Sequence, residues 1–237
     1  MKKIISLIPV KKNSSELKRK NFLKLNKLSL FEISILASKK SKKIISTYVS
    51  SDSKKVQQMT SKYNINFIKR KKKLCSNNTS ANEVIFDFLF NLKKKINIEN
   101  LILVYLQPTS PFRNHKHIDE ALDIFLKSSA RTLVSVHENK NYYKSLKKRN
   151  KYLKPINVKI FNDNRQNLEK IYQPNGALYI FYACDFLKYK KFNFKKNLGF
   201  IMNNIESIDI DNKEDYEFAK YLSKKNLIYN LKSQYKK

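Results

Sequence analysis

A near-continuous apolar run at residues 101–106 constrains the fold of this chain more than any other feature. Such a run is typical of a central parallel strand that is buried on both faces. Pro108 and Pro111 end it, because proline fixes φ and has no N–H to donate. Residues 115–129 then show helical spacing, with Asn114 as the expected N-cap. The pattern predicts a strand that delivers polar side chains to a ligand-binding sheet edge, although a rigid turn without chemistry also fits.

The alternation of strand and helix patterns predicts an α/β fold with one doubly wound, mostly parallel sheet. Ser29 with Glu32 and Ser80 with Glu83 form capping boxes that predict helix starts, and Asp52 is expected to cap another helix. The expected strands are 3–10, 44–49, 66–69, 101–106, 132–136, 177–182 and one or two within 200–208. The expected helices are 30–40, 53–63, 81–96, 115–129 and 213–224, followed after residue 226 by a frayed tail.

The strand and helix rhythm breaks between about residues 137 and 175, where polar and aromatic residues suggest short antiparallel strands. A segment of this length without helical period is usually a functional lobe or a partner surface. We therefore expect a single domain, 1–237, that carries a lobe at about 137–175.

The net charge of +31 taken alone suggests a nucleic-acid or membrane partner. Lysine is nevertheless spread over every segment, so we expect no nucleic-acid partner, although a polyanionic substrate would be attracted. No apolar run is long enough to span a membrane, and the first ten residues do not resemble a secretory signal. Cys75 and Cys184 lie far apart without metal-ligand spacing, which fits a reducing cytoplasm.

Residues 106–113, Leu-Gln-Pro-Thr-Ser-Pro-Phe-Arg, resemble the Leu-Gln-Pro-Thr-Ser-Pro-Leu-Arg signature of the CMP-N-acetylneuraminate (acylneuraminate) cytidylyltransferases. The resemblance continues at residues 175–180 and 207–215. It implies a Rossmann-like nucleotide-diphospho-sugar transferase fold and the transfer of CMP from CTP to a nonulosonic acid, an acidic nine-carbon sugar. It also implies Mg²⁺ as cofactor and a homodimer, in which the lobe mediates dimerisation and reaches toward the partner's active site.

The loop after the first strand is rich in cations that can meet phosphates, although it is not a Walker A loop. The family loop reads Ala-Arg-x-x-Ser-Lys-Gly and then Lys-Asn. Here Lys11 replaces the Arg, Ser15 and Glu16 replace the Lys and Gly, and Lys20 and Asn21 match. The resemblance gives Lys11 and Lys20 catalytic contact with the triphosphate. The nucleotide-binding residues that it implies are Lys11, Ser14, Lys20, Asn21, Arg70, Ser80 and Gln107.

Asp209 and Asp211 alternate with Ile208 and Ile210, which predicts two carboxylates on one side of a strand end. Two such oxygens suit magnesium. From spacing alone an exposed strand face before a helix cap is the simpler interpretation. The resemblance favours the metal site, with Asp211 also catalytic, because this acidic stretch matches the family's metal-binding end.

The acidic sugar is expected to contact Gln107, Lys144, Arg165 and Tyr179 by the same resemblance. This is chemically reasonable because an arginine fork can bind a carboxylate in bidentate fashion. Gln173 stands where the family often has Arg, and the three histidines form no catalytic or metal arrangement.

Three other interpretations remain open at this stage. The first is a 3-deoxy-manno-octulosonate cytidylyltransferase, which shares the chemistry but has other motifs. The second is a catalytically silent paralogue that binds nucleotide or sugar, suggested by Ser15 and Glu16. The third is a nucleic-acid-binding protein, suggested by the charge. The sequence does not distinguish N-acetylneuraminate from legionaminate as acceptor.

Overall fold

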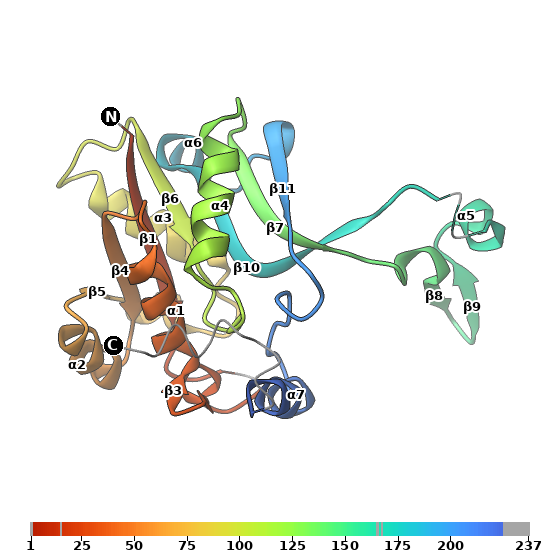
Figure 1. Ribbon diagram of the computed structural model, residues 1–237, viewed down its shortest axis with the longest axis horizontal. Helices are drawn as coiled ribbons and strands as arrows, with labels where there is room; N and C mark the ends of the chain where they lie inside the picture. The colour runs from red at the N-terminus through yellow and green to blue at the C-terminus, as the bar shows by residue number, and fades with distance from the viewer. Residues whose placement is uncertain (1, 15, 165, 167, 225–237) are drawn as a thin grey trace.

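The computed structural model describes residues 2–14, 16–164, 166 and 168–224, and its centre is a seven-stranded sheet (Figure 1). The strands of this sheet are β1 (Lys3–Val10), β4 (Ser46–Ser51), β5 (Asn66–Lys69), β6 (Leu101–Tyr105), β7 (Thr132–Glu138), β10 (Tyr172–Tyr182) and β11 (Asn197–Ile201). Two further antiparallel pairs are β2 (Lys24–Leu25) with β3 (Leu28–Ser29), and β8 (Leu146–Arg149) with β9 (Tyr152–Pro155).

Helices connect most of these strands. The α-helices are α1 (Leu30–Lys40), α2 (Lys54–Lys62), α3 (Ala81–Leu92), α4 (His115–Leu126), α5 (Val158–Asn162), α6 (Ala183–Tyr189) and α7 (Lys213–Lys224). The short 3₁₀ helices are η1 (Lys20–Phe22), η2 (Lys72–Cys75), η3 (Tyr142–Lys144) and η5 (Phe194–Lys196).

The sheet has the strand order β11-β7-β10-β6-β1-β4-β5. β10 is antiparallel to both of its neighbours, and every other adjacent pair is parallel. The expected mostly parallel α/β sheet is therefore confirmed. Parallel strands end at one edge, so the loops after β1, β4 and β6 lie together there.

Helices cover both faces of the sheet, as the alternation of side chains along β1 requires. Ile4 and Ile8 pack on one face with residues of α1, α2 and α4, and Ile5 and Leu7 pack on the other with residues of α3 and α6. Each fully buried side chain of this size contributes about 1.5–3 kcal/mol. The two apolar layers hold the central strands in place. They thereby also position the start of each loop that follows one of these strands.

A third apolar cluster packs at the edge of the sheet where the parallel strands end. It contains Leu25 and Leu30 near the start of α1, Phe112 from the signature octet, Ile210, and Leu222 from α7. Phe112 and Ile210 are almost completely buried. Segments far apart in sequence are thus brought to one edge by apolar packing.

Several predicted elements are confirmed closely. β1, β5 and α7 have the expected bounds, and Ser29 and Asn114 cap α1 and α4 as expected. The second strand, β4, lies two residues later than predicted, and α3 ends at Leu92 because the chain turns at residues 93–95. The sequence patterns gave no sign of α6. The predicted frayed tail lies outside the described residues.

Two local predictions were wrong. Ser53, rather than Asp52, caps α2, because its hydroxyl accepts the Val56 amide at 3.4 Å. The Asp52 carboxylate instead accepts the Lys12 amide at 2.9 Å. Residues 208–211 pair with no strand of the described chain, since the chain turns at 204–207 after β11 ends.

The lobe is carried on long extensions of β7 and β10. These strands pair again at Tyr172–Pro174 after an irregularity, and they lead to the β8–β9 hairpin and α5, which extend away from the sheet (Figure 1). The expected short antiparallel strands are thus present. None of the described helices is long and apolar enough to cross a membrane.

Candidate active site

Gly176 marks the point where three segments meet. It adopts a φ of 75°, a left-handed value that favours glycine. A Cβ placed on it would lie 2.6 Å from Gln107 Oε1 and 3.1 Å from Asp209 Oδ2. The side chains of Gln107, after β6, and of Asp209 therefore lie against the bare backbone of β10.

The buried side chain of Arg113 stabilises this arrangement by hydrogen bonds. Its side chain is completely buried and donates to Gln107 O at 3.3 Å, to Ala177 O at 3.3 Å and to Ser34 Oγ at 2.8 Å. Burial lowers the pKa of Arg113 to about 9. No carboxylate of the described residues pairs with it. Arg113 thus links residues 106–113 to β10. This link places Gln107 beside Gly176.

The segment that carries Asp209 is tied down on both sides of that residue. The Ile210 amide donates to Thr109 O at 2.9 Å. Asn175 Nδ2 donates to Ser207 Oγ at 2.8 Å, and Asn175 Oδ1 accepts the Ser135 hydroxyl at 2.5 Å. These hydrogen bonds position the segment around Asp209, for which the sequence pattern had predicted pairing in a β-strand.

Asp209 and Asp211 lie in different environments, contrary to the expectation of one strand face. Burial is the main cause that raises the pKa of Asp209, and the charges of Asp211 and Asp215 raise it further. Thr109 and Lys20 act in the opposite direction. Asp209 Oδ1 is buried without a hydrogen-bond partner, whereas Asp211 is exposed and accepts Lys20 Nζ at 2.7 Å.

This pair of aspartates suits a magnesium ion by the chemistry of its donors. Magnesium is usually bound by one or two carboxylates, with substrate phosphates and water completing the shell. A buried carboxylate oxygen without a partner, with a second carboxylate two residues away, provides such a partial shell. Among the described residues no three His, Cys, Asp or Glu side chains gather to hold a metal. Substrate phosphates and water are the ligands that usually complete such a shell.

The first loop closes against the loop at residues 70–80. The Lys11 ammonium donates to Ser76 O at 2.9 Å and to Asn77 Oδ1 at 2.7 Å. Asn21 is buried, and its side-chain amide donates to Lys11 O at 3.0 Å. Ser14 lies half-buried in the same loop, and Ser15 lies outside the described residues. The structure thus brings Lys11 and Asn21 together.

Arg70 and Ser80 flank this second loop. Arg70 is buried and donates to Ser50 Oγ at 3.3 Å and to Ser50 O at 2.9 Å, and burial lowers its pKa. Ser80 forms the predicted capping box, with its hydroxyl 2.8 Å from Glu83 Oε2. Both side chains have structural partners, and their contact with nucleotide stays a prediction.

The expected sugar-binding residues are not all together. The Tyr179 ring stacks on Phe192 with centroids 5.0 Å apart, and burial raises its pKa, with a further contribution from the charge of Asp209. Lys144 lies in the lobe, where its ammonium donates to the carbonyls of Phe161 and Asp163. Arg165 lies outside the described residues. Within one chain the structure places Tyr179 near Asp209, but it leaves Lys144 in the lobe.

Sequence reasoning assigned no role to Arg113, Asn175 or Thr109. All three lie within or beside the recognised motifs, so a signal was present. What was missing is the identity of their partners, because Ser34, Ala177 and Ser207 are remote in sequence.

A mostly parallel sheet that presents lysines, a glutamine and two aspartates at the carboxyl ends of its strands is the arrangement with which open α/β proteins bind their ligands. The chain matches the model of the cytidylyltransferase family over residues 5–234, and it belongs to that family. The resemblance inferred from the motifs is thereby confirmed.

Two relatives illustrate this membership. The N-acylneuraminate cytidylyltransferase of Escherichia coli O18:K1:H7 is 30% identical over 221 residues, which are 92% of this chain and 51% of that protein. Post-translational flagellin modification protein B of Campylobacter coli is 30% identical over 232 residues, 96% of this chain and 98% of that protein. The chain thus spans about half the length of the first relative and nearly all of the second.

One similar solved structure is a CMP:2-keto-3-deoxy-manno-octonic acid synthetase complexed with CTP. It has a TM-score of 0.69 and is 13% identical, and the match covers 94% of this chain and 99% of that one. At this identity the similarity establishes the fold alone, and it confirms the expected fold class.

Proposed function

We propose that this protein transfers CMP from CTP to a nonulosonic acid and releases pyrophosphate. The observation that carries the proposal is the convergence of Gln107 and Asp209 on Gly176, in a chain of the cytidylyltransferase family. The pair formed by Lys20 and Asp211 lies at the same edge. A cation and two carboxylates next to a neutral amide suit a triphosphate, its counter-ion and a sugar.

In the proposed reaction the C2 hydroxyl of the sugar attacks the α-phosphorus of CTP. A new P–O bond forms while the bond to the β-phosphate oxygen breaks, the proton of the hydroxyl passes to solvent water, and pyrophosphate leaves. Lys20 exchanges its contact with Asp211 for the triphosphate, where its charge stabilises the transition state. Lys11 holds the two loops closed beside the nucleotide, and Asn21, Ser14, Arg70 and Ser80 complete that pocket.

Asp209 and Asp211 would hold the magnesium ion, which supplies charge neutralisation at the α-phosphate. The carboxylate of Asp209 is ready for a cation, because burial makes its negative charge unfavourable when nothing balances it. Lys20 balances only part of the charge of the acidic group.

The acceptor sugar would lie between Gln107 and Tyr179, on the Asp209 side of the sheet. Lys144 and Arg165 would reach this sugar from the lobe of a second subunit. Support for a homodimer comes from the apolar side chains that the lobe exposes, among them Tyr152, Leu153 and Val158. We further propose that the enzyme acts in the cytoplasm and supplies an activated sugar for surface polysaccharide synthesis.

The deciding experiment measures pyrophosphate release with CTP, magnesium and a panel of nonulosonic acids, including N-acetylneuraminate and legionaminate. Asp211→Ala is the matched control. Release with one acid, absent in the control, establishes both reaction and acceptor. No release with any acid, from folded protein that binds CTP, rejects catalysis for this panel.

The second candidate function is nucleotide binding without turnover. Glu16 favours it, because this carboxylate stands where the family has glycine in a loop that approaches phosphates. Calorimetric binding of CTP, together with the absence of pyrophosphate release in the same preparation, would identify this function.

A further inference from the structure

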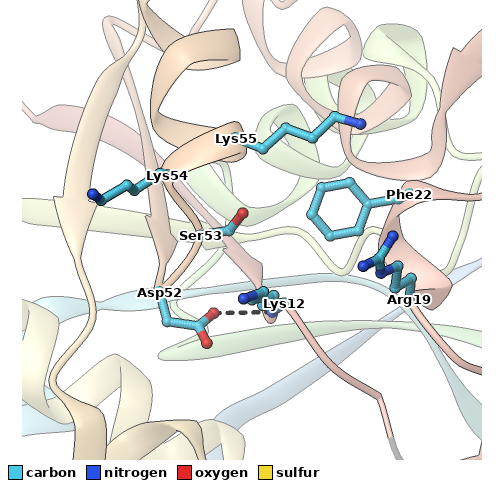
Figure 2. A pocket seen from close by; sticks show the side chains of 7 residues that line it. All are labelled: Lys12, Arg19, Phe22, Asp52, Ser53, Lys54 and Lys55. Atoms are coloured by element: carbon cyan, nitrogen blue, oxygen red, sulfur yellow. Dashed lines mark hydrogen bonds between the residues drawn. The ribbon is translucent and has the colours of Figure 1, made fainter.

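Two of the loops that follow parallel strands are each held by a side chain from a distant segment. In the first loop, the Lys12 amide donates to the Asp52 carboxylate beside a cavity that both residues line (Figure 2). In the aspartate segment, residues 203–211, the carboxylate of Glu206 lies 3.2 Å from the ring of His117. The proposed reaction assigns no role to His117 or Glu206.

The ring of His117 joins two segments through its two nitrogens. His117 lies in the first turn of α4, where Nδ1 accepts the backbone amide of the helix cap, Asn114, at 3.3 Å. Burial is the main cause that lowers the pKa of His117, and the charge of Arg113 lowers it further, whereas the charges of Glu206 and Glu120 raise it. The ring is therefore neutral at pH 7. Because Nδ1 is an acceptor, the single ring proton lies on Nε2 and is donated to Glu206 Oε1.

This hydrogen bond is well protected from water. The side chains of His117 and Glu206 are 11% and 24% exposed, whereas the Asp211 side chain, in its ion pair with Lys20, is 59% exposed. The His117 ring also packs at an angle to the Phe200 ring of β11, with centroids 6.3 Å apart. Because water and salt screen exposed pairs, we expect the more buried contact to be the stronger of the two.

The turn that carries Glu206 passes this restraint along the chain. The Glu206 amide donates to Asn203 Oδ1 at 3.0 Å, and the Ser207 amide donates to Asn203 O at 3.0 Å. Asp209 follows Glu206 by three residues, a span of at most about 11 Å of extended chain. Fixing Glu206 therefore restricts where the backbone of Asp209 can lie.

The aspartate segment is thus held on both sides of Asp209. His117 holds it at Glu206, and the Thr109 carbonyl holds it at the Ile210 amide. Both partners belong to the stretch that runs from the end of β6 into α4. Asp209 Oδ1 has no hydrogen-bond partner among the described residues, so its direction depends on the backbone on either side.

We propose that His117 is a positioning residue that, through Glu206, sets the direction in which Asp209 presents its carboxylate to a divalent cation. The proposal rests on the proposed function for the identity of that cation as magnesium, whereas its geometry rests on the contact between His117 and Glu206. His117 acts by holding the aspartate segment and not by contact with the reacting groups. Groups that orient metal ligands in this way typically change metal affinity by about 10–100-fold.

Two substitutions of His117 separate its hydrogen bond to Glu206 from its role in the helix cap. His117→Gln should retain both, because glutamine at this position of a capping box accepts the Asn114 amide, and its own amide can donate to Glu206. His117→Glu should retain the cap but places a second carboxylate against Glu206, which breaks the contact. Asp123→Ala is the matched control, because it removes another ion pair of α4, with Lys43.

Amide hydrogen exchange tests the restraint without metal or nucleotide. In His117→Glu, the Ile210 amide should exchange about tenfold faster relative to the amides of β6, because a hydrogen bond to a charged group is lost. In His117→Gln and in Asp123→Ala, this ratio should remain as in wild type. An unchanged ratio in His117→Glu would overturn the proposal, because the variant would then have altered only global stability.

Binding of Mn²⁺ tests the link to the cation. Electron paramagnetic resonance measures it on protein in excess over CTP, without acceptor sugar, so that no turnover occurs. His117→Glu should weaken Mn²⁺ binding about tenfold, while His117→Gln binds as wild type and the affinity for CTP in metal-free buffer stays constant in all variants.

Three results would overturn the proposal at this step. They are unchanged Mn²⁺ binding in His117→Glu, a loss in His117→Gln equal to that in His117→Glu, and no Mn²⁺ binding by wild type. Neither the exchange measurement nor the Mn²⁺ measurement needs turnover. A protein that passes both tests but releases no pyrophosphate would therefore reject the proposed reaction and retain the positioning role of His117.

Discussion

Gly176→Ala tests whether the close approach of three segments builds the site. The new methyl group would meet Gln107 Oε1 at 2.6 Å and Asp209 Oδ2 at 3.1 Å, so both side chains must move. The φ of 75° adds a backbone cost of about 1–2 kcal/mol for a residue with a Cβ. We expect the free energy of unfolding to fall by about 1–3 kcal/mol, a typical range for overpacking.

The kinetic effect of this substitution should exceed its effect on stability. A displacement of about 1 Å in a positioned group can cost about 100-fold in rate. We expect kcat/KM for pyrophosphate release to fall by about that factor at temperatures where the variant is fully folded. Urea unfolding and steady-state kinetics measure the two effects separately.

The chain provides its own control, because Gly199 is its only other glycine. A Cβ at Gly199, on β11, would lie 3.3 Å from Val136 Cγ2, a tight contact remote from the aspartates. Gly199→Ala should change stability by less than about 1 kcal/mol and leave kcat/KM unaltered. If Gly176→Ala keeps wild-type kcat/KM, the convergence at Gly176 does not form the active site.

Three other perturbations test the electrostatics and the positioning. Asp209→Asn should raise the melting temperature at pH 7 in magnesium-free buffer, because an ionised carboxyl with a raised pKa destabilises the folded state by about 1.4 kcal/mol per pKa unit. The same substitution should abolish turnover, because it removes a proposed magnesium ligand. The gain in melting temperature should vanish as the pH falls below the ordinary pKa of aspartate, where both states are protonated, and a gain that persists there would contradict the reasoning. Lys20→Met should lower the free energy of unfolding by less than about 1 kcal/mol but lower kcat about 100-fold. A small loss of stability with an equally small loss of kcat would exclude a role of Lys20 in stabilising the transition state. Ser207→Ala should raise the magnesium concentration needed for half-maximal rate, while the affinity for CTP, measured by calorimetry, stays as in wild type.

Elements specified by local chemistry were predictable from the sequence. The β1 and α7 bounds and the caps at Ser29 and Asn114 follow from patterns within a few residues. Asp52 shows the limit of such patterns, because Asp52 and Ser53 are both good caps in adjacent positions. Ser53 rather than Asp52 becomes the cap because the Asp52 carboxylate accepts a hydrogen bond from the Lys12 amide, which is 40 residues away in the sequence. No local pattern contains that partner.

The motifs located the site, whereas its geometry depends on long-range contacts. The alternation around Asp209 and Asp211 correctly predicted that Ile210 is buried, but it was interpreted as a strand. The actual constraint is the apolar cluster shared by Ile210 and Phe112, together with the bond from Ile210 N to Thr109 O. A two-residue period indicates an extended backbone, and it does not reveal whether a neighbouring strand is present.

The same packing gives a physical reason for the different character of the two aspartates. Ile210 anchors the segment in the apolar cluster, and the Asn175 bond to Ser207 fixes its approach. Asp209 is therefore drawn inward against Gly176, while Asp211 remains at the surface beside Lys20. We therefore expect the half-buried carboxylate of Asp209, whose Oδ1 is fully buried, to gain more from a cation than the exposed Asp211, which can exchange its lysine for substrate at little cost.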